Sequence, residues 1–149
     1  MLVMTLIPCP AFLSFLTSLF ILYKYFIFGN IKTMYLLIII IICAILGSKF
    51  DFYKKYFWWD VMIHTISGIA FSRIGMMIAN MCDISFNQKL IYAFMFAVTI
   101  HVFWELFEFG CDEIIGTNMQ RKQSIVADTM TDFVANILGA ILSCFYYLL

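Results

Sequence analysis

The stretch HVFWELFEFGCDE, residues 101–113, places one histidine and four acidic residues in a chain of 149 residues that is 64% hydrophobic and only 12% charged. His101, Glu105, Glu108 and Asp112 follow one another at intervals of four, three and four residues. Such spacing puts them on one narrow face of a helix, and Glu113 falls outside that face. The stretch therefore predicts the end of an apolar helix that carries a single polar stripe.

The segments around this stretch are long and apolar enough to cross a membrane. A spanning helix needs about 20 mostly apolar residues, and five segments approach this pattern, at about 11–28, 34–47, 58–79, 90–109 and 126–149. We therefore expect an all-α fold, a polytopic membrane helical bundle with about five transmembrane helices, in a single domain over residues 1–149.

The charges and cysteines exclude some classes of function and suggest an orientation. Nine Lys and Arg balance nine Asp and Glu, so no nucleic-acid partner is expected. The five cysteines contain no CxxC motif, and they predict neither a disulfide framework nor a cysteine metal site. The loops that follow segments 34–47 and 90–109 hold five basic residues, against three on the other side. The positive-inside rule then predicts a cytoplasmic N-terminus.

Two other predicted helices carry polar stripes of their own. Segment 126–149 has Asp128, Asp132 and Asn136 at intervals of four residues, and segment 58–79 has Asp60 and His64 one turn apart. Segments 58–79 and 126–149 begin on the membrane face where segment 90–109 ends, so the three stripes lie at similar depths. We expect them to face one another and to line a polar funnel.

Carboxylates inside a bilayer are costly and usually mark a functional site. Several acids within a few ångströms cannot all be ionised unless a proton, a basic group or a metal ion lies among them. Histidine with carboxylates suits Zn, Mn or Fe, whereas an all-oxygen subset suits Mg or Ca. The residues predicted to bind a proton or a divalent metal ion are His64, Glu105, Glu108 and Asp132. A second tier comprises Asp60, His101, Asp112, Asp128 and Asn136.

A structural interpretation of the same residues is also open. His64 could be a packing histidine, Asn136 could join two helices by hydrogen bonds, and Asp60 and Asp128 could stabilise helix N-termini. Buried acids are a costly way to join helices, however. The structural interpretation therefore explains three residues poorly: Glu105, Glu108 and Asp132.

Three stretches of the chain resemble a family of bacterial membrane-spanning proteins, the YjdF-like family: WWDVMIHTISG, WELFEFGCDEIIGTNMQ and DTMTDFVANILGA. The last stretch is also similar to the tail of the VanZ-like family, D-x-x-x-N-x-x-G, which here reads Asp132, Asn136 and Gly139 with Arg121 before it. VanZ-like proteins have an acidic pair followed by Gln where this chain has Glu105 and Glu108. The resemblance covers about the last 90 residues. It implies a multi-pass protein of the bacterial cell membrane that acts in cell-envelope homeostasis or antibiotic tolerance.

Three classes of function remain open at this point. The first is a non-enzymatic membrane protein whose acidic and histidine funnel binds a cation or protons. The second is a membrane-embedded, metal-dependent enzyme that acts on a lipid headgroup or a lipid-linked precursor. The third is a structural subunit of a membrane complex. In all three classes the protein is expected to lie in the lipid bilayer. All three are also compatible with a homo-oligomer, a membrane partner, or a lipid-linked or small-molecule ligand.

Overall fold

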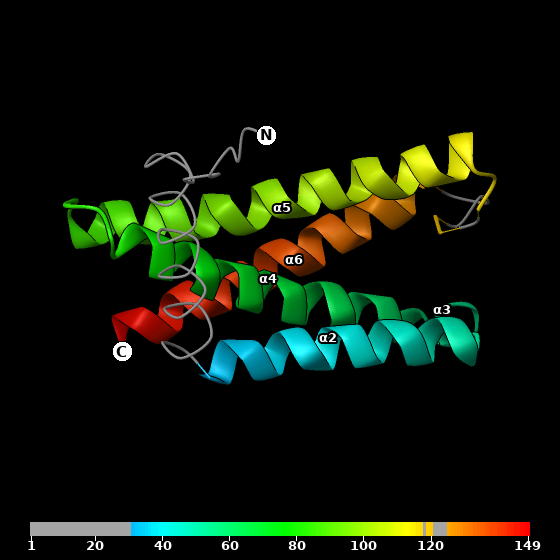
Figure 1. Ribbon diagram of the computed structural model, residues 1–149, viewed down its shortest axis with the longest axis horizontal. Coiled ribbons are helices and arrows are strands. Elements are labelled where there is room, and N and C mark those ends of the chain that lie inside the picture. The colour runs from blue at the N-terminus through cyan, green and yellow to red at the C-terminus, as the bar shows by residue number, and fades with distance from the viewer. Residues whose placement is uncertain (1–30, 118, 121–124) are drawn as a thin grey trace, which may run out of the picture. The chain divides into compact units, whose positions relative to one another are not determined.

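The computed structural model describes residues 31–117, 119–120 and 125–149, and within these ranges every regular element is a helix. The helices are α2 (Ile31–Lys49), α3 (Phe52–Lys55), α4 (Phe57–Ala79), α5 (Phe86–Ile114) and α6 (Ile125–Leu148) (Figure 1). Residues 35–149 form one compact unit. The helix predicted at 11–28 lies outside the described residues.

Four of these helices, α2, α4, α5 and α6, are long and apolar enough to cross a membrane. This confirms the predicted polytopic helical bundle. The bounds agree with the predicted segments to within a few residues, except that α5 extends beyond 90–109 at both ends. Its start is fixed by a capping box, in which the Ser85 Oγ accepts from the Gln88 backbone N–H and the Gln88 side chain accepts from the Ser85 N–H. Its polar end stays helical because backbone hydrogen bonds do not require apolar side chains.

The short helix α3 was not predicted. It follows a left-handed turn at Asp51 (φ 56°), and Lys55 Nζ donates to the Phe50 carbonyl at 2.9 Å. The Phe52 ring packs edge-on against Trp59, with 4.8 Å between centroids. Aromatic rings gathered at a helix end in this way suit the boundary between the hydrocarbon core and water.

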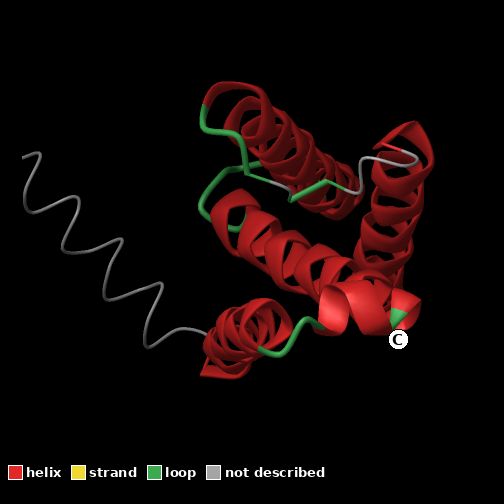
Figure 2. Ribbon diagram, turned by 90° about the vertical axis from the view of Figure 1, so that its right-hand side faces the viewer, coloured by secondary structure: helices red, strands yellow, loops and turns green. Residues whose placement is uncertain are grey.

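Helix α4 is the centre of the bundle, because it packs against both α5 and α6, and these two helices also touch (Figure 2). The crossing of α4 and α6 depends on two glycines. A Cβ atom at Gly68 would collide with the Asn136 carbonyl oxygen, and one at Gly139 would collide with the Thr65 carbonyl oxygen. Small residues allow such close approach of helices in membranes, and here the approach brings the polar stripes of α4 and α6 together.

Candidate functional site

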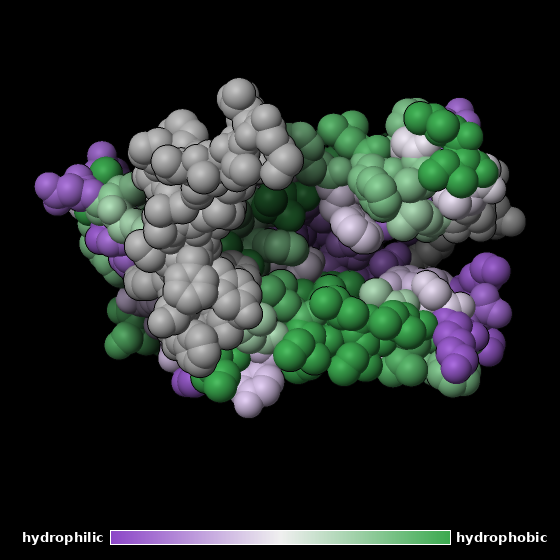
Figure 3. All heavy atoms as spheres, viewed as in Figure 1, coloured by the Kyte–Doolittle hydropathy of each residue, from purple (hydrophilic) through white to green (hydrophobic). Residues whose placement is uncertain are grey.

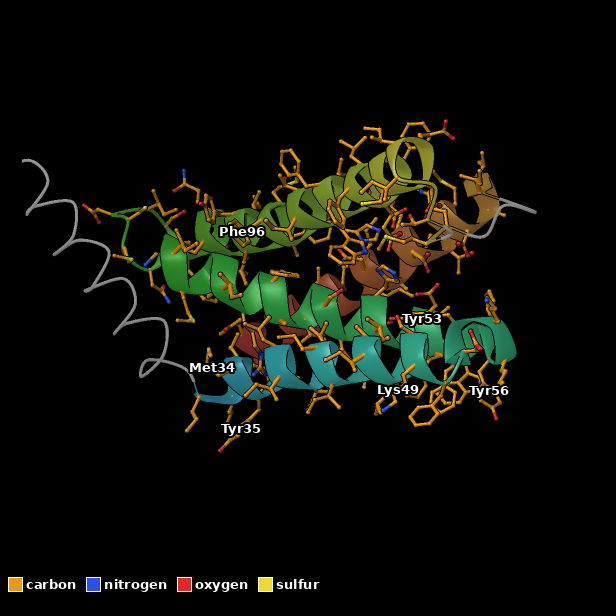
Figure 4. All side chains as sticks on the ribbon, turned by 45° about the vertical axis from the view of Figure 1, so that its right-hand side comes forward. Met34, Tyr35, Lys49, Tyr53, Tyr56 and Phe96 are labelled. Atoms are coloured by element: carbon orange, nitrogen blue, oxygen red, sulfur yellow. The ribbon has the colours of Figure 1, made fainter. Side chains whose placement is uncertain are left out.

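Two histidines from different helices form the middle of a polar cluster. His64 of α4 and His101 of α5 have ring centroids 5.1 Å apart, in an edge-to-face arrangement. His64 Nε2 lies 3.4 Å from Asp60 Oδ1 and 3.8 Å from Asp132 Oδ2, and His101 Nε2 lies 3.5 Å from Glu105 Oε1. Figure 4 shows side-chain nitrogen and oxygen atoms gathered between α4, α5 and α6. The structure thus brings five of the predicted site residues together.

The cluster is almost completely withdrawn from the surface. The exposed fraction is 6% for His64, 3% for His101, 9% for Glu105 and 4% for Asp132. The Asn136 side chain is also buried, at 1%. Groups of this polarity are stable at such a depth only when their charges and hydrogen-bonding atoms find partners.

Several of these atoms make no hydrogen bond among the described residues, although two of them face each other at 3.5 Å. They are His101 Nε2, Glu105 Oε1, and both the nitrogen and the oxygen of the Asn136 side-chain amide. A buried polar atom without a hydrogen bond costs about 1–3 kcal/mol. A bound ion or polar ligand would remove this cost.

The spacing of the atoms also fits a metal ion. Ligand atoms of His64, His101 and Glu105 lie within 4.8 Å of one another, and the same holds for Asp60, His64 and Asp132. Tetrahedral ligands at ~2.0–2.2 Å from one ion stand roughly 3.3–3.6 Å apart. Three pairs in the cluster have separations near this range: His64–Asp60 at 3.4 Å, His101–Glu105 at 3.5 Å and His64–Asp132 at 3.8 Å. An N–H···O hydrogen bond is normally shorter, about 2.7–3.2 Å. His64 belongs to both groups, so the two sets share one side chain.

Glu108 lies beside the cluster and belongs to neither of these two groups. Its Oε1 accepts a hydrogen bond of 2.7 Å from Trp104 Nε1, one helical turn earlier in α5. It faces the same cavity as His64 and His101. Glu108 is therefore a residue of the cavity wall, held in place by a tryptophan.

Asp112 and Asp128 are placed differently. Asp112 accepts hydrogen bonds from Thr117 Oγ1 and from the backbone N–H groups of Met119 (2.8 Å) and Gln120 (2.9 Å). It therefore holds the chain that follows α5, which supports a structural role. Asp128 is buried in the first turn of α6, where an acid interacts favourably with the helix dipole.

A cavity of about 540 Å³ lies between α2, α3, α4 and α5. One wall carries Asp60, His64, His101 and Asn136 together with the neighbouring Glu108, whereas Glu105 and Asp132 are not among the lining residues. Figure 3 shows a hollow between α5 and α2 with hydrophilic residues in its depth and hydrophobic residues on its rims. An ion held by the cluster would thus have buried acids behind it and the cavity in front.

Tyr53 and Trp104 are among the cavity residues that the sequence did not indicate as part of a site. Tyr53 points toward the inside of the bundle, whereas Tyr56 and Lys49 point outward (Figure 4). Burial raises the pKa of the Tyr53 phenol to about 12, and the nearby carboxylates of Asp60 and Glu108 add to this effect. Tyr53 therefore remains an O–H donor at neutral pH. The position of Tyr53 could not be predicted, because a helix as short as α3 shows no periodic pattern in the sequence. Trp104 could have been found, because it lies four residues before Glu108 and therefore on the same side of α5.

Comparisons with known proteins bear on the identity of the chain. An uncharacterized protein of Thermotoga maritima is 26% identical over 99 residues, which cover 64% of this chain and 50% of that protein. The chain thus spans about half the length of the curated relative it matches. No solved structure matches. The family described as "Predicted membrane protein (DUF2238)" matches residues 3–149. Because this match covers nearly the whole chain, the protein belongs to that family of membrane proteins.

Proposed function

We propose that this protein is a multi-pass membrane protein that binds a divalent metal ion within its helical bundle. The ligands are drawn from His64, His101 and Glu105, with Asp60 and Asp132 on the other side of His64. The observation that carries the proposal is the approach of buried imidazole and carboxylate atoms from two helices to within 4.8 Å of one another. Histidine and carboxylate together favour Zn, Mn or Fe over Mg or Ca.

The unpartnered atoms support a metal ion over a packing role. A histidine that only fills space normally has its ring nitrogens hydrogen-bonded, whereas Nε2 of His101 makes no hydrogen bond in the described part of the chain. Glu105 Oε1, only 3.5 Å away, is in the same situation. One cation between these two atoms would satisfy both. Proton binding at the same site is the competing form of this function.

The bacterial cell membrane is the proposed location, with the N-terminus in the cytoplasm. The similarity of the last 90 or so residues to the YjdF-like and VanZ-like patterns supports a role in envelope homeostasis or antibiotic tolerance. Asp132, Asn136 and Gly139 carry the VanZ-like part of this similarity. Two of them are cluster residues, and Gly139 permits the helix crossing that positions them.

A metal-dependent enzyme acting on a lipid headgroup or lipid-linked precursor is the second candidate function. The cavity in front of the cluster favours it, because catalytic metal sites keep a coordination position open to substrate. A structural subunit of a larger complex is the third, and a partner that supplied the missing hydrogen bonds would favour it.

Elemental analysis of the detergent-purified protein tests the metal site. We expect about one equivalent of a transition metal in the wild-type chain and loss of most of it in Glu105→Gln and His101→Ala. Glu113→Gln is the matched control, because Glu113 is exposed on the same helix and should retain the metal. The purified protein is then stripped with a chelator and titrated with Zn²⁺ and Mn²⁺. Absence of metal after gentle purification, together with no saturable binding in the titration, would exclude a metal site. Proton uptake without metal would then favour the proton-binding form.

A further inference from the structure

We infer that the cavity in front of the cluster binds a lipid-borne phosphate, with a phosphate oxygen on the metal ion and the hydrocarbon chain leaving between α2 and α5. This inference rests on the proposed metal site and names the ligand class of that site. The shared chemistry is a phosphate oxygen, which a lipid phosphate and free inorganic phosphate both offer. The shape of the cavity favours the lipid-borne form.

The residues that line the cavity indicate the direction in which a bound metal ion would have a free coordination position. His64 and His101 line the cavity, whereas Glu105 and Asp132 do not. An ion coordinated by members of both pairs has Glu105 or Asp132 on its buried side, whereas Asp60 belongs to the cavity wall. A coordination position left open by the protein would then face the cavity, where an anionic oxygen can replace water as the ligand.

Part of the cavity is lined by apolar residues. Helix α2 contributes Ile40 and Ala44, and the wall opposite includes Phe71 and Ile100. Within residues 31–117, α2 and α5 make no close backbone approach, and the hollow between them has hydrophobic rims (Figure 3). Both helices belong to the membrane-spanning set, so among the described residues the gap between them opens at the depth of the lipid chains. A cavity of about 540 Å³ falls in the usual range for a small-molecule site, ~300–1,000 Å³. It accommodates a headgroup and the first part of a chain, and the rest remains in the bilayer.

Hydrogen-bond donors suited to a phosphate headgroup lie at one end of the cavity. The hydroxyl of Tyr53 and the amine of Lys54 stand at the α3 end of the cavity, and both are donors suited to phosphate oxygens. Lys54 is 3.4 Å from Asp51 at the surface, with both side chains well exposed, so it can turn toward a ligand. The unpartnered Asn136 amide offers a further donor deeper in the cavity.

The acidic wall makes binding of this ligand depend on the metal. Asp60 and Glu108 line the cavity, and their carboxylates repel a phosphate when no cation is present. The same wall would attract an amine headgroup in the metal-free protein. Dependence on metal and preference for phosphate over amine are thus two separable consequences.

The experiment uses the 149-residue protein in detergent, a fluorescent single-chain lipid phosphate, and the same lipid ending in a hydroxyl or an amine. With Zn²⁺-loaded wild-type protein we expect at least ten-fold tighter binding of the phosphate lipid than of either analogue, and loss of this preference after chelation. Inorganic phosphate should compete only at concentrations at least a hundred-fold higher than the lipid phosphate.

Variants of α2 provide the structural control. Ala44→Phe fills the cavity and should weaken binding of the lipid phosphate at least ten-fold, and Ala44→Leu serves in the same way if the larger residue prevents folding. Ile45→Phe is the matched control, since Ile45 is 58% exposed on the same helix. All three should keep the metal content of the wild type.

The outcomes separate this inference from the proposed function. Normal metal content with no preference for phosphate overturns the inference and leaves the metal site standing, whereas missing metal overturns both. Equal competition by inorganic phosphate overturns the lipid-borne form. Tighter binding of the amine lipid to loaded protein overturns the phosphate assignment.

Discussion

At the scale of single residues, the polar side chains of α5 have two different tasks although they share one stripe. His101 and Glu105 face the buried cluster with unpartnered atoms, whereas Asp112 is engaged by the chain that follows the helix. Seven residues separate Glu105 from Asp112, about two turns or ~10 Å along the axis. The stripe therefore passes from a candidate ligand site to a structural contact within one helix.

Asp112→Ala should destabilise the protein without loss of metal. It removes a carboxylate that accepts from Thr117 and from two backbone N–H groups, and hydrogen bonds to charged groups contribute about 1.5–3 kcal/mol each before solvent exposure reduces them. We expect a loss of about 1–3 kcal/mol in the free energy of unfolding, measured by denaturant titration in detergent, with unchanged metal content. Loss of the metal in a chain of wild-type stability would show instead that Asp112 is a ligand.

At the scale of elements, the contact between α4 and α6 determines whether the cluster forms. Gly68 and Gly139 place each helix against the backbone of the other. Asp132 approaches His64 across the same interface, at 3.8 Å. A small increase in the distance between the two helices would therefore separate a carboxylate of α6 from the histidine of α4.

Gly139→Ala tests this interface, because its new Cβ atom would collide with the backbone carbonyl of Thr65. Overpacking of this kind costs about 1–3 kcal/mol, and we expect a lower Tm together with weaker metal binding. Gly110→Ala is the control, since a Cβ atom there meets nothing within 4 Å. That substitution should leave metal binding unchanged and stabilise α5 by about 0.5–1 kcal/mol through helix propensity. A Gly139→Ala protein as stable and as metal-rich as wild type would contradict this account of the helix contact.

At the scale of the whole molecule, the alternation of helices places the cluster near one side of the membrane. Helix α2 ends, α4 begins, α5 ends and α6 begins at the same end of the bundle (Figure 1). The turn at residues 80–85 lies at the other end. Lys49, Lys54 and Lys55 flank the first of these ends, so the positive-inside rule predicts that it faces the cytoplasm.

Thiol labelling in intact cells tests this orientation. Cys82 is exposed in the turn between α4 and α5, and it should react with a membrane-impermeant maleimide. A cysteine introduced by Asp51→Cys in a Cys82→Ser background should react only after the cells are opened. The reverse pattern would place the mouth of the cavity toward the exterior, and the N-terminus with it if segment 11–28 crosses the membrane as predicted.

The sequence by itself determined the class of fold and the positions of the polar stripes. Length and hydropathy define the spans because the bilayer imposes both, and α-helical periodicity places His101, Glu105 and Glu108 on one face without any knowledge of neighbours. Only the tertiary structure decided which residues meet. Packing at Gly68 and Gly139 sets the crossing of α4 and α6 and brings Asp132 to His64. The packing of α5 against α4 brings His101 to His64. Packing also places Glu108 and Tyr53 at the cavity wall and Asp112 against the loop that follows α5. The sequence could not predict these contacts, because periodicity within one helix carries no information about contacts made across the bundle.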